Sequence, residues 1–295
     1  MGLGMPTLMA LERAGVFGTG NVSVLDIGTS NLYHAPVDDI LHLFEKYPRR
    51  PLDDRLRAKA HDLSERSAPD PSRPRAMTLV GELLAETTIR YQSIDVFRTP
   101  FTRVLDLNFD RLPRDMRGRF EVVLNCGTTE HVFGQFNAFR VMHDALRPGG
   151  HFFHQVPATG FFNHGYFAYH PRLFGDLAAA NGYEIVGLTY SEPQGYGVFA
   201  GGCSPPSNLA DPSAFRESVR RLAEETPRVP NGLLNALLRK DRSAPFRVPL
   251  ETVSSLDEAD SRIGQGYGRV HRFRAARRVL KAVGVKRALQ ALRLW

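Results

Sequence analysis

Cysteine is scarce in this chain: its 295 residues include only Cys126 and Cys203. Two cysteines cannot build the disulfide framework that stabilises small secreted domains, so we expect a reducing compartment. The chain also lacks an apolar run of the roughly 20 residues that a membrane-spanning helix needs. A basic segment followed by an apolar one, the mark of a secretory signal, is missing from the first residues. These absences predict a soluble, cytoplasmic protein.

Acidic residues are missing from segment 262–295, which carries 10 Lys and Arg and no Asp or Glu. The rest of the chain holds 28 basic and 31 acidic residues, so the net charge of +7 belongs to this segment. Its apolar residues fall near one face of a helix. We therefore expect a domain over 1–260 and a basic helical tail over 261–295. The tail could lie on an anionic membrane surface, bind nucleic acid, or pack on the body or on a second subunit of a homodimer.

The stretch 120–157 has the order of a strand, a helix and a strand. Residues 121–124 form a short run dominated by Val and Leu that suits a strand buried on both faces. Thr128 or Thr129 can cap a following helix, which ends where Arg, Pro and two Gly coincide at 147–150. A second apolar strand over 151–156 completes a right-handed βαβ unit. With 42% apolar residues, an α/β domain with a large core is expected.

The first predicted strand, 22–26, ends on an acid. Gly28 follows Asp26 by two residues, and the G-x-G-x-x-G pattern of dinucleotide sites is absent. If this strand feeds a crossover, a helix would begin at this point. A carboxylate there would repel a pyrophosphate and attract a cation, and Gly28 lets the backbone pass close to it. The loop therefore suits the positively charged amino and sulfonium groups of S-adenosylmethionine better than NAD.

Five segments in this order resemble class I S-adenosylmethionine-dependent methyltransferases, over about 22–190. The segments are VLDIGTSN, YQSIDVF, VLDLNFDRLP, FEVVLNCGTTEHVF and LRPGGHFFHQVP. The resemblance implies a doubly wound, Rossmann-like α/β fold whose mostly parallel sheet has a C-terminal antiparallel strand. Segments 183–190 and 233–238 would supply the antiparallel hairpin, after a helix over 172–181. The resemblance also implies S-adenosyl-L-methionine as the cofactor and methyl transfer as the activity.

The resemblance places this cofactor against four strand ends. The assigned positions are Asp26, Gly28, Thr29 and Ser30 for the methionine end, Asp95 for the ribose, Asp106 and Leu107 for the adenine edge, and Asn125, Cys126 and Gly127 for the floor beneath the sulfonium. Each acid could instead be a strand-end turn residue. One departure from the family is that only a single glycine, Gly28, stands where three alternate. The hydroxyl groups that follow it can still bind a carboxylate.

The second departure is the length of chain between Asp26 and Asp95, which is 69 positions against the roughly 20 of a simple two-strand unit. An insertion is therefore expected at about 38–88. Its apolar residues predict one helix near 40–44 and another near 79–84, and the Pro- and Ser-rich segment 67–74 predicts a loop. The insertion could form a lid over the substrate or a helical pad packed on the sheet.

Methyl transfer to oxygen needs a group that takes a proton, and histidine is the natural base. Glu130 with His131, after the fourth strand, and His154, on the fifth, are the predicted catalytic residues; His164 and His170 are loop alternatives. Each histidine could instead be a hydrogen-bonded structural residue. No metal is expected, because no His-x-x-x-His pair shares a helical face with a carboxylate.

Three functions remain open from the sequence. The first is methyl transfer to oxygen or nitrogen of a small-molecule or glycan acceptor. The second is a nucleic-acid methyltransferase recruited by the basic tail 262–295. It is disfavoured for base-amino methylation, because Asn125 is followed by Cys and Gly where that class has two prolines. The third is a non-catalytic protein with a methyltransferase-like fold. A nicotinamide dehydrogenase is excluded by Asp26 and by the missing glycine pattern.

Overall fold

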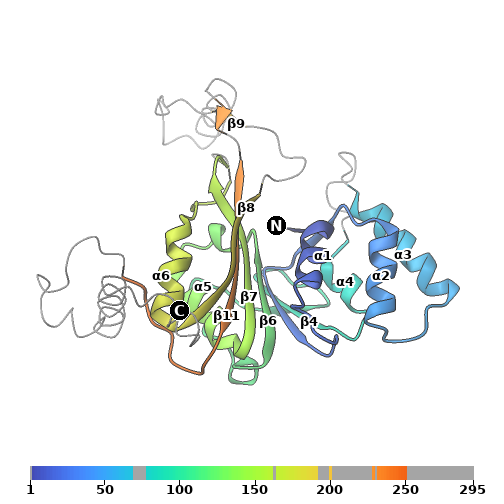
Figure 1. Cartoon of the computed structure of the whole chain (residues 1–295), viewed down its shortest axis with the longest axis horizontal. Helices are drawn as coiled ribbons and strands as arrows, with labels where there is room; N and C mark the ends of the chain where they lie inside the picture. Colours follow the sequence, from blue (N-terminus) through green and yellow to red (C-terminus); the bar gives the residue numbers. More distant parts are fainter. Residues whose placement is uncertain are drawn as a thin grey trace, which may run out of the picture.

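A seven-stranded sheet runs through the computed structural model, which describes residues 2–68, 78–161, 164–191, 199–200, 228–229 and 231–250. The strands lie in the order β5-β4-β2-β6-β7-β11-β8. Their bounds are β2 Ser23–Ile27, β4 Arg90–Asp95, β5 Thr102–Val104, β6 Phe120–Cys126, β7 Leu146–Thr159, β8 Tyr183–Ser191 and β11 Gly232–Lys240. From β5 to β7 the strands pair in parallel, whereas β11 pairs antiparallel with both β7 and β8 (Figure 1). The predicted fold class, including the antiparallel strand, is confirmed.

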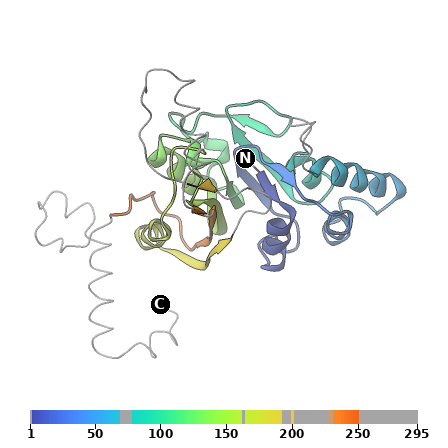
Figure 2. The ribbon, with the colours of Figure 1, turned by 90° about the horizontal axis from the view of Figure 1, so that it is seen from above.

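Helices cover both faces of the sheet. Their bounds are α1 Met5–Arg13, α2 Val37–Lys46, α3 Asp54–Ser67, α4 Val80–Leu84, α5 Gln135–Ala145 and α6 Pro171–Asn181. In Figure 1 and Figure 2, α2 and α3 lie on the side of the central strands away from α6. The remaining described elements are the pairs β1 Gly2–Gly4 with β3 Asn31–Tyr33 and β9 Phe199–Ala200 with β10 Arg228–Val229, and the 3₁₀-helices η1 Arg114–Met116 and η2 Thr129–His131.

The central strands β2 and β6 are buried on both faces, as their apolar runs predict. Successive side chains of a strand point to opposite faces, so each strand contributes to two cores. Val24 packs in the core beside α1 to α4, and Leu25 packs in the core beside α5 and α6. Asp26 lies two residues after Val24, so the two side chains are on the same face of the sheet. The strand thus holds a carboxylate inside an apolar layer.

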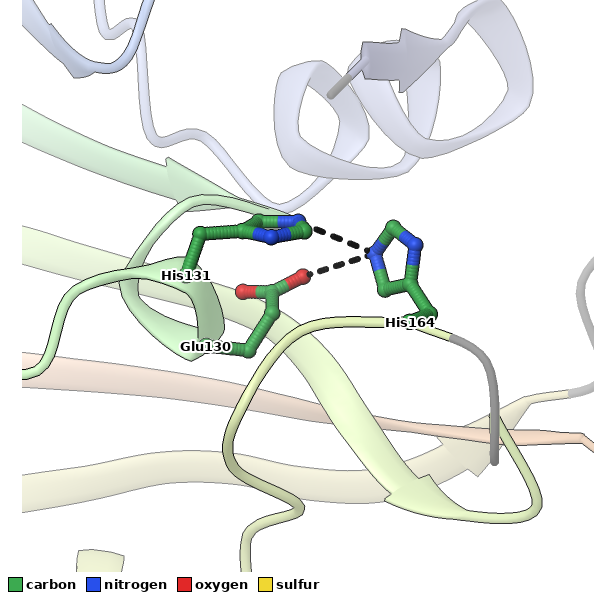
Figure 3. Close-up of side chains that lie close together, drawn as sticks. All are labelled: Glu130, His131 and His164. Atoms are coloured by element: carbon green, nitrogen blue, oxygen red, sulfur yellow. Dashed lines mark hydrogen bonds and ion pairs between the residues drawn. The ribbon is translucent and has the colours of Figure 1, made fainter. Parts of the chain in front are cut away.

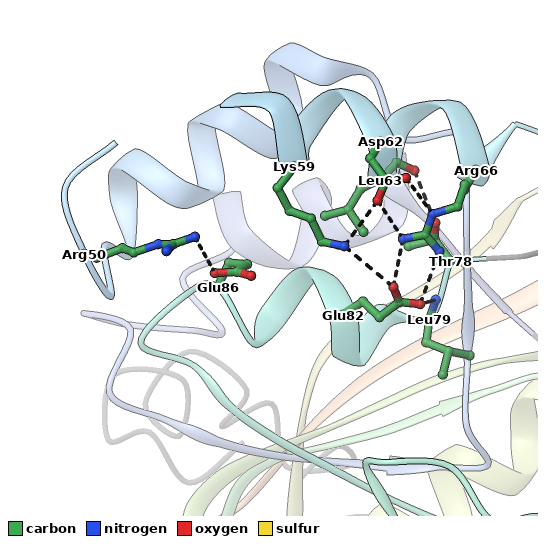
Figure 4. Close-up of polar contacts among 9 residues, drawn as sticks. All are labelled: Arg50, Lys59, Asp62, Leu63, Arg66, Thr78, Leu79, Glu82 and Glu86. Carbon is green, nitrogen blue, oxygen red and sulfur yellow. Dashed lines mark hydrogen bonds and ion pairs between the residues drawn. The ribbon is translucent and has the colours of Figure 1, made fainter. Parts of the chain in front are cut away.

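The insertion after β2 is a helical pad packed on the sheet. Its helices α2, α3 and α4 place Leu43, Leu63 and Leu83 in the same core as Val24 of β2. The sequence predicted only two helices here and missed α3, whose apolar positions are few among many charged residues. On its outer side Arg66 links α3 to α4: its guanidinium lies 3.0 Å from Asp62 Oδ2 and 2.8 Å from Glu82 Oε2 (Figure 4).

Two local predictions were wrong. No helix begins at Gly28: β3 comes first, and α2 begins only at Val37. Neither Thr128 nor Thr129 caps the helix after β6. The short η2 turn comes first, and α5 begins after Gly134. The helix ends at Ala145, close to the predicted end at 147–150, and β7 begins at Leu146 and so includes the Arg-Pro-Gly-Gly segment.

Two predicted segments lie outside the described residues, namely most of the loop 67–74 and the whole of the basic tail 261–295. Among the helices that the structure does describe, none is long and apolar enough to cross a membrane.

Candidate functional site

The predicted cofactor acids lie at neighbouring strand ends on one edge of the sheet. In the parallel pairing, Asp26 of β2 stands opposite Ser93 of β4 and opposite Leu124 of β6. Asp95 therefore lies one residue beyond the part of β4 that pairs with β2, and Asn125 lies one residue beyond the part of β6 that pairs with β2. Val104 at the end of β5 pairs with Asp95, and Asp106 follows two residues later. The carboxyl ends of parallel strands are where open α/β sheets bind ligands.

Asp26 is fully buried, yet only one of its carboxylate oxygens is bonded. Oδ2 accepts hydrogen bonds from the Ser30 amide at 3.0 Å and from the Tyr91 hydroxyl at 2.6 Å. Oδ1 has no hydrogen-bond partner. Burial raises the pKa of Asp26 to about 6, against the lowering effect of the bonds from Tyr91 and Ser30, and the nearby Asp95 adds to the rise. A buried oxygen without a partner is costly unless a ligand donor meets it.

The loop after β2 is held by bonds to the neighbouring strand. Gly28 has φ +82°, a conformation that favours glycine, and its amide donates to the Ile94 carbonyl at 2.7 Å. The Thr29 amide donates to Asp95 Oδ2 at 2.8 Å. Its hydroxyl lies 2.9 Å from the Ser93 hydroxyl and 3.0 Å from the Thr102 hydroxyl. The Thr29 hydroxyl therefore ties the loop after β2 to β4 and β5, whereas the buried Ser30 hydroxyl has no hydrogen-bond partner.

The residues predicted for the ribose and adenine differ in how they are engaged. Asp95 accepts from the Thr29 amide through Oδ2 and from the Phe97 amide at 3.1 Å through Oδ1. Asp106 accepts from the amide and the side-chain Nδ2 of Asn108, at 2.8 Å and 3.0 Å, and so closes a local turn. The Leu107 side chain is buried, 5% exposed, in the core beside α5 and α6. The structure thus brings Asp26 and Asp95 to one loop, while Asp106 bonds within its own turn.

A buried polar network follows β6 and holds η2 in place. Asn125 donates to Thr129 Oγ1 at 2.9 Å, and its Oδ1 accepts from the Thr129 amide at 3.2 Å. The Tyr169 hydroxyl lies 3.0 Å from Thr129 Oγ1 and 2.8 Å from Gln135 Oε1. Cys126 is buried, and the Gly127 amide donates to the Gln155 carbonyl at 3.0 Å. Asn125 therefore fixes the turn that carries Glu130 and His131.

Glu130, His131 and His164 form a cluster at this edge, which Figure 3 shows with the three side chains facing one another. His131 Nε2 lies 3.2 Å from His164 Nε2, and Glu130 Oε1 lies 3.4 Å from His164 Nε2. Glu130 is completely buried, whereas both histidines are exposed. Burial lowers the pKa of His131; the Glu130 carboxylate opposes this effect and His164 adds to it. The loop residue His164, which 33 positions of chain separate from His131, was predicted only as an alternative.

The predicted base His154 lies inside the molecule, 3% exposed. Its ring packs against Phe139, Phe152 and Phe174, and its Nδ1 lies 3.1 Å from Asn125 Nδ2. Burial lowers its pKa to about 3, so the ring is neutral at pH 7. The other loop candidate, His170, caps α6, since its Nδ1 accepts from the Arg172 amide at 3.1 Å.

A hollow of about 210 Å³ lies away from these groups. Residues of α6 and of the segment after β11 line it, namely Ala180, Asn181, Arg242, Ser243, Ala244, Pro245 and Arg247. The sequence did not single out these residues, and none of the predicted site residues lines this hollow.

The sheet is mostly parallel and ends in an antiparallel pair of strands, β8 and β11, and acids stand at or next to successive strand ends. The order and direction of the strands agree with the class I methyltransferase fold that the sequence predicted.

Comparison with known proteins gives distant structural likenesses. No protein-family model and no curated protein matches the chain. An S-adenosylmethionine-dependent methyltransferase of Archaeoglobus fulgidus is 12% identical at a TM-score of 0.38, covering 80% of this chain and 94% of that one. The 1,6-didemethyltoxoflavin-N1-methyltransferase of Burkholderia thailandensis is 13% identical at 0.37, covering 80% and 76%. The [4+2]-cyclase SpnF is 13% identical at 0.40, covering 80% of each chain. A cyclase thus stands beside methyltransferases, and likenesses at these values assign no activity.

Proposed function

We propose that this chain binds S-adenosylmethionine at the carboxyl edge of its sheet and transfers the methyl group to oxygen or nitrogen of a small-molecule or glycan acceptor. One observation carries the proposal. Asp26 is a fully buried acid near the carboxyl end of β2, and its Oδ1 has no hydrogen-bond partner. A ligand with a positive charge, such as the amino or sulfonium group of this cofactor, satisfies that oxygen and its charge together.

The other cofactor contacts in this proposal follow the strand ends. Asp95 takes the ribose hydroxyls through the lone pairs that the Thr29 and Phe97 amides leave open. Asp106 and Leu107 take the adenine edge. Asn125, Cys126 and Gly127, which end β6, form the floor beneath the sulfonium. Gly28 and the hydroxyl groups of Thr29 and Ser30 take the carboxylate end of the methionine.

Cofactor binding in this proposal changes the loop after β2. The Thr29 amide and hydroxyl are already bonded, to Asp95 and to Ser93 and Thr102. A cofactor carboxylate or ribose that uses these groups must exchange bonds within the protein for bonds to itself. We therefore expect binding to be weaker than for a loop whose amides are open, and to move residues 28–30.

The acceptor in this proposal lies next to η2. Methyl transfer is an in-line displacement at carbon, in which the acceptor's lone pair forms the new bond as the carbon–sulfur bond breaks. An oxygen acceptor then has to lose its proton. His131, exposed and at the edge that carries the floor residues, is the proposed proton acceptor, with Glu130 beside it. His154, neutral and enclosed by aromatic rings, is proposed instead to hold Asn125 in place.

Calorimetric titration of the full chain with S-adenosylmethionine tests this proposal. We expect the wild-type chain to bind the cofactor and Asp26→Ala to lose most of its affinity. Asp115→Asn removes an exposed acid from η1 and serves as the matched control, with unchanged affinity. No binding at millimolar cofactor would support the non-catalytic alternative. Equal affinity in Asp26→Ala would remove Asp26 from the site and, with it, the observation that carries the proposal.

A further inference from the structure

The cluster of Glu130, His131 and His164 contains a buried carboxylate whose two oxygens lack hydrogen-bond partners. Oε1 lies 3.4 Å from His164 Nε2, an ion pair only when that ring is protonated. A fully buried carboxylate normally receives several hydrogen bonds, and leaving it without them costs free energy. A cation held between this carboxylate and the two rings removes that cost.

The spacing of the ligand atoms suits a single cation. All three groups offer an atom within 4.8 Å of the others, and the two measured separations are 3.2 Å and 3.4 Å. Two atoms that each lie about 2.1 Å from a common ion are about 3.0 Å apart at a right angle and about 3.4 Å apart at the tetrahedral angle. Small movements of exposed rings therefore bring all three ligands to one centre (Figure 3).

The backbone holds this cluster together across 34 positions of chain. The carbonyl of Glu130 accepts from the Tyr166 amide at 2.7 Å and from the Phe167 amide at 3.3 Å. Gly165, at φ +70°, passes so close that an added Cβ would lie 2.9 Å from Glu130 Cγ. The segment that carries His164 is thus fixed against η2 before any ligand binds, which is how preorganised metal sites are built.

We propose that Glu130, His131 and His164 bind a divalent first-row transition cation such as Zn²⁺. Two imidazole nitrogens and one carboxylate suit these ions, whereas Mg²⁺ and Ca²⁺ prefer oxygen ligands. His164 is 41% exposed and His131 is exposed as well, so solvent reaches the remaining coordination positions. Three protein ligands with an open position is the arrangement of catalytic rather than structural zinc sites.

This site stands independently of methyl transfer and changes one assignment in it. A histidine nitrogen that binds a cation cannot also accept a proton from the acceptor. If His131 binds the cation, it can no longer be the proposed base. The proposed cofactor contacts at Asp26 and Asp95 are unaffected. Because cation binding is measured directly, its failure leaves the cofactor titration intact, and failure of the cofactor titration leaves the cation site intact.

The experiment titrates the full chain, free of any histidine tag and stripped with a chelator, with Zn²⁺ alone. We expect one high-affinity site per chain, with affinity reduced by more than about tenfold in His131→Ala and in His164→Ala. His61→Ala removes an exposed histidine from α3 and is the matched control, with unchanged affinity. Absorption spectra with Co²⁺ in place of Zn²⁺ give a second measurement, since the ligand-field bands of Co²⁺ report its coordination number and geometry.

Two further variants test whether the buried Glu130 carboxylate takes part in cation binding. Glu130→Gln should also weaken binding more than about tenfold, and its fold is checked by circular dichroism. Gly165→Ala should weaken binding with all three ligands present, because its Cβ would meet Glu130. No Zn²⁺ site in the wild-type chain would overturn the proposal. So would binding that survives in both histidine variants while depending on residues elsewhere.

Discussion

Polar groups at the carboxyl end of β2, the first side, and those at the carboxyl end of β6, the second side, are held differently. Around β2, Asp95 accepts from the Thr29 amide and the Thr29 hydroxyl lies within hydrogen-bond distance of the Ser93 hydroxyl, whereas Asp26 Oδ1 and Ser30 Oγ have no hydrogen-bond partner. After β6, Asn125 and Thr129 are fully bonded, but the Glu130 carboxylate that they position has no hydrogen bond at all. On the first side a ligand has to displace bonds that the protein already makes. On the second side it has to supply bonds that the protein lacks.

The largest expected effect on stability comes from the buried network around Asn125, which holds the turn η2 after β6. Asn125→Ala leaves the Thr129 amide and His154 Nδ1 without their buried partner. Because this network is buried, we expect the free energy of unfolding to fall by about 3 kcal/mol. Urea unfolding measures the change, and Asn21→Ala, at an exposed position before β2, is the control. A loss below about 1 kcal/mol would show that the network does not position η2.

A smaller effect, an increase in stability, is expected from a change at Asp26 on β2. Asp26 has an ordinary pKa of 3.8 in the unfolded chain and about 6 in the folded one, so ionising it costs about 2 to 3 kcal/mol of stability. This cost is fully present above pH 6 and disappears as the pH falls below 4. Asp26→Asn should therefore be more stable than the wild type by about 2 kcal/mol at pH 7. Thermal unfolding at pH 7 and pH 4 measures both values; a difference that stays constant would contradict the assignment.

A substitution at Asp95 should show how much the bonds of the loop after β2 contribute to stability and to cofactor binding. Asp95→Ala removes the acceptor of the Thr29 and Phe97 amides, and we expect a loss of about 1 kcal/mol of stability. We also expect weaker cofactor binding, because the ribose loses its proposed acceptor. Titration with S-adenosylmethionine and with its 2′-deoxyribose analogue separates the two effects. Equal affinity for both by the wild-type chain would argue against the ribose contact.

The smallest effect on stability is expected from the surface residue Arg66. Arg66 on α3 bonds Asp62 and Glu82 at the surface of the pad, far in sequence from the predicted site. Partly exposed ion pairs contribute little, so Arg66→Ala should cost less than about 1 kcal/mol of stability. Cofactor and Zn²⁺ affinity should both stay at wild-type values. A loss of either affinity would show that the pad reaches the sheet edge.

The strands and their edge could be predicted because their signals are local. An apolar run followed by Asp26 or Asn125 marks a strand end, and parallel strands place such ends together. The helix α3 could not, because its apolar residues Leu56, Ala60 and Leu63 are too few among charges to mark a buried face. Packing against α2 and α4 supplies what the pattern lacks.

The partners of the predicted residues were harder to find. Tyr91, which donates to Asp26, precedes the second strand's acid without any motif of its own. Tyr169 and His164 reach the turn after β6 from a loop some 35 positions away, so only tertiary structure brings them together. The start of α5 was misplaced because Gly134, rather than a threonine, stands at its N-terminal end.

The position of β11 has a consequence for how the chain is made. This strand, the last in the sheet to be synthesised, inserts between β7 and β8, and its final residue Lys240 donates to the carbonyls of His143 and Leu146. Until residues 232–240 leave the ribosome, β7 and β8 each present an open edge to other nascent chains. A chain truncated before residue 232 would keep the predicted site residues but leave β7 without its antiparallel partner, and an unpaired strand edge favours aggregation.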